Sequence, residues 1–177
     1  MKHASGFTLV ELLVVITLVA MFSSLSFIAW RSGEGSLAIE RAAVRISQDI
    51  RRATELSLRA EWTSCSAPGT ISGYGLFFYS SFDQPTYVLF ADCNNDQKFS
   101  SGDKWVQVID LEKGVWISAI SPGTPWSIVI VPPEPAIFIK DSSGDSFSNA
   151  QITLSLINNP AVTKVINLNS KGVVNIQ

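Results

Sequence analysis

The strongest pattern in the chain is an apolar run near its start. No charged residue occurs between Leu12 and Trp30, and only four hydroxyl side chains interrupt these nineteen residues. At about 1.5 Å per residue they form a helix about 29 Å long, close to the thickness of a bilayer core. Glu11 precedes the run, and a carboxylate in hydrocarbon costs about 2.5–3.5 kcal/mol at the centre and less near the edge. The pattern predicts a membrane-spanning helix over residues 7–30.

A second helical pattern follows over residues 31–62. Its apolar positions recur in steps of mostly three and four, which is one stripe of an amphipathic helix. Gly33 and Gly35 each weaken a helix by roughly 1 kcal/mol relative to alanine, so we expect a bend or a short melted segment there. The stripe consists of Ile39, Ala43, Ile46, Ile50, Ala53, Leu56 and Ala60.

Residues 63–177 carry strand signals instead. Nine short stretches rich in β-branched and aromatic residues alternate with turn residues, and no helical pattern separates them, which predicts antiparallel sheets. The prolines of residues 132–135 cannot donate ladder hydrogen bonds and indicate an edge or a crossing between sheets. The predicted strands are 74–79, 86–91, 105–111, 115–120, 126–131, 136–140, 151–157, 163–169 and 173–176. The predicted fold class is therefore α+β, a long N-terminal helix whose second half packs on a β-sheet head.

The N-terminal residues resemble a known signal. Gly6, Phe7 and Glu11, between a short basic leader and the apolar run, resemble the class III signal of type IV pilins and pseudopilins. The resemblance implies cleavage after Gly6 by a prepilin peptidase, N-methylation of Phe7, and pairing of Glu11 with the N-terminal amine of a neighbouring subunit. An ordinary signal peptide is the alternative, but residues 23–26 are a poor A-x-A-like site.

The order of elements resembles the GspH/FimT type of minor pilins and pseudopilins. This resemblance is looser: it covers the whole chain in outline and rests on the long β region, the phrase from Phe90 to Asp96, and residues 171–173. It implies residues 1–6 as leader, a filament-core helix at 7–30, and a head that faces solvent in the filament.

Charge and composition narrow the function. Loss of residues 1–6 removes one of 13 basic side chains and leaves 15 acidic ones, a net charge of −3. This is a poor platform for non-specific nucleic-acid binding. The only histidine is His3, so the mature chain lacks a Ser-His-Asp or Cys-His arrangement, and no P-loop, G-x-S-x-G or zinc spacing occurs. We expect a structural protein and not an enzyme.

The predicted location of the chain decides whether its two cysteines can form a disulfide. Lys2 precedes the apolar run and Arg31 follows it, which indicates a single-pass protein of the inner membrane with a cytoplasmic N-terminus. Cys65 and Cys93 would then lie outside the cytoplasm, where a disulfide is permitted. Two separate buried thiols are the alternative, because the sequence does not show whether the two Cα atoms lie within about 7 Å.

One polar segment has the spacing of a calcium loop. Oxygen side chains fall at positions 1, 3, 5, 9 and 12 of residues 92–103, and the Lys98 carbonyl could supply position 7. Position 6 is Gln97 instead of the usual glycine, position 12 is a short aspartate, and no helix flanks the loop. A polar hairpin loop with Asx-turns is the alternative. The calcium hypothesis names Asp92, Asn94, Asp96, Lys98, Ser100 and Asp103.

Two residue sets suggest ligands only weakly. Four arginines of the second helical segment could bind DNA phosphates, but acidic residues among them favour a solvated or inter-subunit face. Five tryptophans could stack on sugars or bases, but aromatic residues in strands are more often core. These sets are Arg41, Arg45, Arg52 and Arg59, and Trp30, Trp62, Trp105, Trp116 and Trp126.

Overall fold

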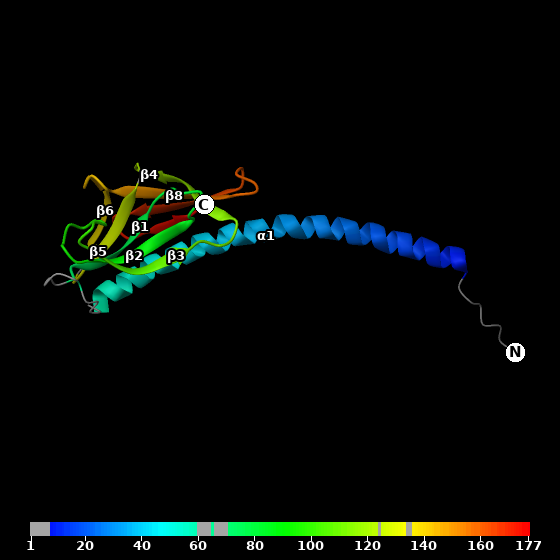
Figure 1. The fold of residues 1–177 in the computed structure, drawn as a ribbon, viewed down its shortest axis with the longest axis horizontal. Coiled ribbons are helices and arrows are strands. Elements are labelled where there is room, and N and C mark those ends of the chain that lie inside the picture. Colours follow the sequence, from blue (N-terminus) through cyan, green and yellow to red (C-terminus); the bar gives the residue numbers. More distant parts are fainter. Residues whose placement is uncertain (1–7, 60–64, 66–70, 124, 134–135) are drawn as a thin grey trace. The chain divides into compact units, whose positions relative to one another are not determined.

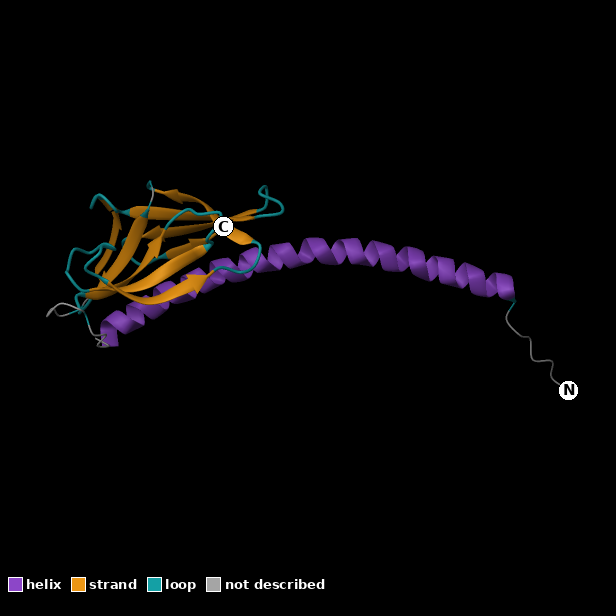
Figure 2. Cartoon of the chain, viewed as in Figure 1, coloured by secondary structure: helices purple, strands orange, loops and turns teal. Residues whose placement is uncertain are grey.

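The computed structural model describes residues 8–59, 65, 71–123, 125–133 and 136–177, without the side chains of 25–33. Gly6, Phe7 and Trp62 lie outside the described residues. The fold is α+β, as predicted, with a long helix followed by antiparallel sheets (Figure 2). The chain divides into two compact units, Met1–Leu37 and Ala38–Gln177, which we describe separately.

The helix α1 runs from Leu9 to Arg59 without interruption. Residues 31–36 are helical, so the expectation of a melted segment at Gly33 and Gly35 is wrong. Two glycines cost about 2 kcal/mol of helix propensity, which the helical residues on both sides outweigh.

The described part of the second unit contains ten strands, nine of them close to the predicted stretches. The additional strand, β7, is only two residues long and carries too little pattern to be predicted. The strands are β1 (Gly73–Phe78), β2 (Thr86–Asp92), β3 (Lys104–Asp110), β4 (Val115–Ser121), β5 (Trp126–Val131), β6 (Ala136–Asp141), β7 (Ser146–Phe147), β8 (Asn149–Leu156), β9 (Thr163–Asn169) and β10 (Val174–Ile176).

These strands form two antiparallel sheets. A six-stranded sheet has the order β3-β2-β1-β5-β6-β7, and a four-stranded sheet has the order β10-β9-β8-β4. The inner faces of both sheets and the stripe of α1 share one hydrophobic core. A smaller cluster of Val88, Phe90 and Val129 lies on the outer face of the six-stranded sheet.

The second half of α1 packs on the head along the predicted stripe. Ala43, Ile46 and Ala53 are fully buried, and Ile39 and Ile50 are only 3% exposed. In this unit α1 runs alongside β2 and β3 (Figure 1). Burial of these apolar side chains supplies most of the free energy that holds the helix on the head, at roughly 25 cal/mol per Å² of apolar surface.

Polar contacts fix the helix at defined points of the head. The Tyr87 hydroxyl donates to Asp49 Oδ2 at 2.5 Å. Burial, and then the hydrogen bond to the Asp49 carboxylate, raise the pKa of Tyr87 far above its ordinary value. Lys164 Nζ of β9 lies 2.8 Å from Glu40 Oε2, so α1 is tied to both sheets.

A further polar contact joins the end of α1 to two strands of the six-stranded sheet. Ser57 is 2% exposed, accepts a hydrogen bond from the Tyr74 N–H, and donates one to the Ile130 carbonyl, both at 2.9 Å. Tyr74 and Ile130 are opposite residues of β1 and β5. The Ser57 hydroxyl therefore attaches the last helical turns to the centre of the six-stranded sheet.

The proline-rich segment has a different place from the one predicted. Val131 pairs with Ala136, so residues 132–135 connect neighbouring strands of one sheet. The expectation of an edge or a crossing between sheets is wrong, because proline without an N–H is equally suited to a hairpin connection, where no ladder bond is required.

Candidate functional site

The start of α1 is built as a capped helix terminus. The Glu11 N–H donates to Thr8 Oγ1 at 3.3 Å, and the Leu12 N–H donates to the Thr8 carbonyl at 3.1 Å. Thr8 and Glu11 have the spacing of a capping box, a signal that the sequence analysis missed. Glu11 lies exposed in the first turn, where a carboxylate interacts favourably with the helix dipole.

The first turns of α1 expose apolar side chains in every direction. The large hydrophobic residues from Leu9 to Phe22 are 46–78% exposed. The hydroxyls of Thr17 and Ser24 bond back to carbonyls one turn earlier, at 2.8 Å from Val14 and Met21 respectively. A helix that is apolar on all sides is stable when other apolar groups surround it.

Within the described residues, no helix has the length and apolarity of a membrane span.

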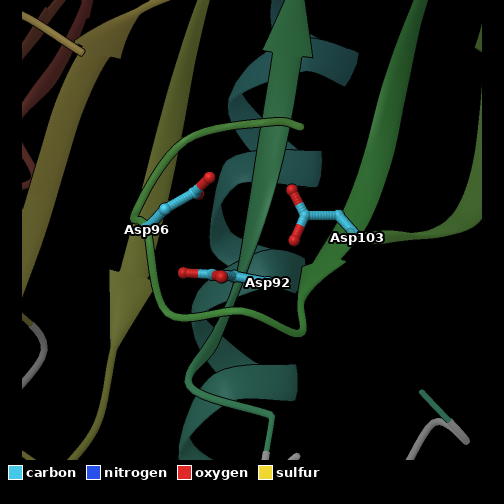
Figure 3. Close-up of side chains that lie close together, drawn as sticks. All are labelled: Asp92, Asp96 and Asp103. Carbon is cyan, nitrogen blue, oxygen red and sulfur yellow. The ribbon is translucent and has the colours of Figure 1, made fainter. Parts of the chain in front are cut away.

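The second candidate site is the loop between β2 and β3. Asp92, Asp96 and Asp103 each offer a carboxylate oxygen, and these oxygens lie within 4.8 Å of one another (Figure 3). Asp92 is fully buried. Of the other predicted ligands, Asn94 and Ser100 belong to the same hydrogen-bonded group, and the Lys98 N–H donates to Asp96 Oδ1 at 3.1 Å. The predicted ligand atom of Lys98 is its carbonyl oxygen, so its side chain is free to donate to the Ser142 carbonyl at 3.2 Å.

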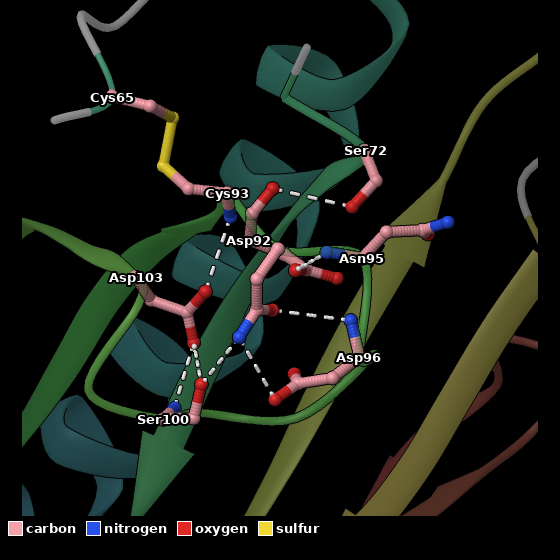
Figure 4. Close-up of a disulfide and its surroundings, with 9 residues drawn as sticks. Cys65, Ser72, Asp92, Cys93, Asn95, Asp96, Ser100 and Asp103 are labelled. Carbon is pink, nitrogen blue, oxygen red and sulfur yellow. Dashed lines mark hydrogen bonds between the residues drawn. A yellow bond between two sulfur atoms is a disulfide. The ribbon is translucent and has the colours of Figure 1, made fainter. Parts of the chain in front are cut away.

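Backbone amides occupy many of the loop's side-chain oxygens. Asp92 accepts from the N–H groups of Asn95 at 2.7 Å and Gln97 at 3.0 Å. Asp103 accepts from Cys93 at 3.1 Å and Ser100 at 2.7 Å (Figure 4). These are the local side chain-to-backbone bonds that the polar-loop alternative predicts. Calcium binding remains a prediction.

The first part of the loop turns sharply at two residues that are not glycine. Asn95 and Gln97 have φ angles of +62° and +59°, so the backbone enters the left-handed region at position 6 of the predicted calcium loop. Asparagine visits this region readily, and glutamine less so. The two backbone N–H groups bonded to Asp92 belong to these two residues. These hydrogen bonds offset part of the conformational free energy that the positive φ angles cost.

The carboxylates of the loop influence one another. Burial raises the pKa of Asp103 above its ordinary value, and the negative charges of Asp92 and Asp96 raise it further. The backbone hydrogen bonds from Ser100 and Cys93 act in the opposite direction. A bound cation would stabilise the ionised carboxylates and lower this pKa.

A disulfide and an aromatic contact hold the loop in place. Cys65 and Cys93 form a disulfide with a Cα–Cα distance of 5.9 Å (Figure 4). The Phe99 ring lies 4.5 Å from Phe77 and 5.1 Å from Phe90, centroid to centroid. Phe99 thus covers the outer face of the six-stranded sheet.

The predicted arginines and tryptophans do not gather into a site. Arg41, Arg45, Arg52 and Arg59 are exposed on α1, with acidic residues between them. Trp126 is fully buried, whereas Trp105 is 58% exposed. Trp116 is half-buried, and the Trp30 side chain lies outside the described residues.

Comparison with known proteins identifies the N-terminal segment. Residues 1–27 match the family model described as the prokaryotic N-terminal methylation motif, which is the leader of type IV pilins and pseudopilins. Neither the curated proteins nor the solved structures contain a match to this chain. The motif supports a type IV pilin-like or pseudopilin subunit, and it suggests a structural rather than a catalytic protein.

Proposed function

We propose that this chain is a minor subunit of a type IV pilus or a type II secretion pseudopilus. The observation that carries the proposal is the methylation motif at residues 1–27, which leads into a capped helix with exposed apolar side chains. Prepilin peptidase would cut after Gly6, and the same enzyme would methylate Phe7. The processed subunit would wait in the inner membrane through residues 7–30 and then enter an extracytoplasmic filament.

Assembly would bury the apolar first half of α1 against other pilin or pseudopilin subunits. Glu11 would pair with the amine of a neighbouring Phe7 only when the subunits are in register. A buried charge pair of this kind contributes more to alignment than to net stability. The cap formed by Thr8 keeps Glu11 in the first turn, close to the new N-terminus.

Two variants of the full-length protein test this proposal. Gly6→Ala should block processing, which leaves a mass larger by residues 1–6 and an unmethylated N-terminus. Glu11→Ala should be cut and methylated normally but incorporate poorly into filaments. Normal incorporation of Glu11→Ala would remove the register role, and a native N-terminus at Met1 or near Ser26 would refute the proposal.

Two other functions remain from the sequence. A DNA- or surface-binding minor pilin would use the exposed arginines of α1, and a gel shift of the full chain with DNA at low and moderate salt would detect it. A membrane-anchored extracellular domain unrelated to pili would lack methylated Phe7. The mass spectrum of the native N-terminus separates this last function from the proposed one.

A further inference from the structure

The outer face of the four-stranded sheet carries no charge. The described strands β4, β8, β9 and β10 contain a single charged residue, Lys164, and its ammonium lies 2.8 Å from Glu40 of α1. Ile152 and Ile166 are fully buried in the core, so the alternate residues of these strands point outward. Charged side chains normally take exposed positions, and their absence from a whole sheet surface needs an explanation.

Amide side chains take the place of charges on this surface, which we call the amide face. One polar row crosses the whole sheet through residues that lie opposite one another on neighbouring strands, and a second, shorter row lies beside it. Neighbouring strands are about 4.8 Å apart and alternate residues of a strand about 7 Å apart, so the rows form a regular array of polar groups. The first row is Asn175, Asn167, Gln151 and Ser121, and the second is Asn169 and Asn149.

Contacts within the protein fix the direction of three of these amides. Gln151 Nε2 donates to Asn167 Oδ1 at 3.2 Å. Asn169 Oδ1 accepts from the N–H groups of Lys171 at 3.0 Å and Val173 at 2.9 Å. The oxygens of both asparagines are thus occupied, whereas their NH2 groups have no hydrogen-bond partner in the part of the chain that the structure describes. The amide face therefore presents oriented donors.

An aromatic pair borders the amide face. Trp116 lies opposite Ser155, which is four residues from Gln151 along β8, a distance of about 14 Å. The Phe82 ring stands edge-on to Trp116 with the centroids 5.2 Å apart, and Phe82 is 53% exposed. Thr153, which lies between the two regions on β8, is also uncharged. A ligand that contacts both the amides and the aromatic pair must be extended and neutral.

We propose that the amide face binds a neutral polysaccharide. Sugar hydroxyls are uncharged and both donate and accept hydrogen bonds, and asparagine and glutamine side chains offer the complementary groups. Binding exchanges hydrogen bonds with water for hydrogen bonds with the ligand. Neutral amides lose less free energy on leaving water than charged groups do. The apolar C–H faces of the sugar rings contact Trp116 and Phe82 at the end of the site.

Other partners fit this surface less well. Nucleic acid is bound through cationic groups that neutralise phosphates, and the described residues of the amide face include none. The centre of a protein–protein interface is rich in aromatic residues, methionine and arginine, whereas here the amides are central and the aromatic residues lie at the border. Glycan binding is a function in addition to the proposed one, and it does not depend on whether the chain enters a filament.

A glycan array tests the proposal with the full-length protein in a zwitterionic detergent, because a detergent with a sugar head group would compete for the site. The array carries neutral oligosaccharides of glucose, mannose and N-acetylglucosamine, and acidic oligosaccharides of uronic acids. We expect binding to neutral members, with longer chains bound more tightly than monosaccharides because the site is extended. Binding to acidic members alone, or to no member, would overturn the proposal.

Isosteric substitutions locate the site. Asn167→Asp/Asn175→Asp keeps the size of both side chains and the oxygen that accepts from Gln151, but it removes two NH2 groups and adds two negative charges. It should weaken binding of the best-bound neutral oligosaccharide about tenfold or more. The matched control Asn158→Asp/Asn159→Asp adds the same charge at exposed positions between β8 and β9 and should bind like the wild type. Equal affinities of the two variants would overturn the assignment to this face.

NMR of the wild type gives a second readout that needs no variant. The side-chain NH2 signals of Asn167 and Asn169 should shift when the same oligosaccharide is added, while those of Asn158 should stay in place. Shifts confined to residues outside the four-stranded sheet would place the ligand elsewhere and overturn the proposal.

Discussion

Replacement of Ser57 by alanine tests how the helix is attached to the head. The Ser57 hydroxyl is buried and makes two hydrogen bonds of 2.9 Å, one from the Tyr74 N–H and one to the Ile130 carbonyl. A typical hydrogen bond contributes about 0.5–1.5 kcal/mol net. Ser57→Ala should therefore lower the free energy of unfolding by about 1–3 kcal/mol.

The assay is chemical unfolding of the full-length protein in detergent, followed by tryptophan fluorescence. Trp126 is fully buried in the core that Ser57 adjoins, so its emission should change when the head unfolds. Ser142→Ala is the matched control, because this hydroxyl also bonds a carbonyl, that of Pro125 at 3.1 Å, but at an exposed position. The control should change stability by no more than about 0.5 kcal/mol.

Equal unfolding midpoints for the two variants would refute the reasoning. Such a result would mean that β1 and β5 close up when the hydroxyl is removed and satisfy the two backbone groups directly. Hydrogen exchange gives a second readout of the same point. In Ser57→Ala the Tyr74 amide should exchange faster, while amides at the centre of β8 should lose only the protection that the global destabilisation explains.

Three further predictions concern the loop between β2 and β3. Reduction of the disulfide should lower the free energy of unfolding by about 3–4 kcal/mol, since it closes a loop over a sequence separation of 28, and denaturation with and without reductant measures this. Because the pKa of Asp103 is raised on folding, its contribution to stability is present below about pH 3.9 and is lost as the pH rises through the folded-state pKa. Asp96→Asn should lower that pKa in an NMR titration, and an unchanged value would contradict the charge coupling. If the loop binds calcium, millimolar CaCl2 should raise the melting temperature of the wild type but not of Asp92→Asn; equal shifts would favour the polar-loop alternative.

The strands could be predicted from the sequence because their signals are local. The alternation of residues 151–157 and the turn residues between strands locate β8 and its neighbours to within a few residues. The pairing of β1 with β5 could not be predicted, since β2, β3, β4 and their loops separate the partners in the sequence and no local pattern specifies their register. The stripe of α1 was predictable, but Ser57, a polar residue beside it, owes its role entirely to distant partners.

The candidate sites were also predictable from the sequence only where the signal is local. Thr8 and Glu11 have the sequence spacing of a capping box, and the structure shows the bond from the Glu11 N–H to the Thr8 hydroxyl. The sequence prediction assigned Glu11 only a role as a charge in the apolar segment and did not include this cap. Three residues of the predicted calcium loop, Asp92, Asp96 and Asp103, lie close together in the structure. The spacing could not show that backbone N–H groups of the loop itself would bond to all three of these carboxylates.

The loop has a structural task that its oxygen pattern does not reveal. Phe99 lies within a polar segment, yet its ring covers Phe90 on the outer face of the sheet, and its N–H donates to Ser127 Oγ of β5 at 2.9 Å. Gly75 lies under the Phe90 ring, where an added Cβ would approach to 2.8 Å, so the sheet is shaped to receive these aromatic side chains. The hydrogen bonds to the carboxylates stabilise the turns that place Phe99 on the sheet. The aspartates therefore have a structural role, which is to keep the loop in the conformation in which Phe99 covers the sheet, with or without a bound cation.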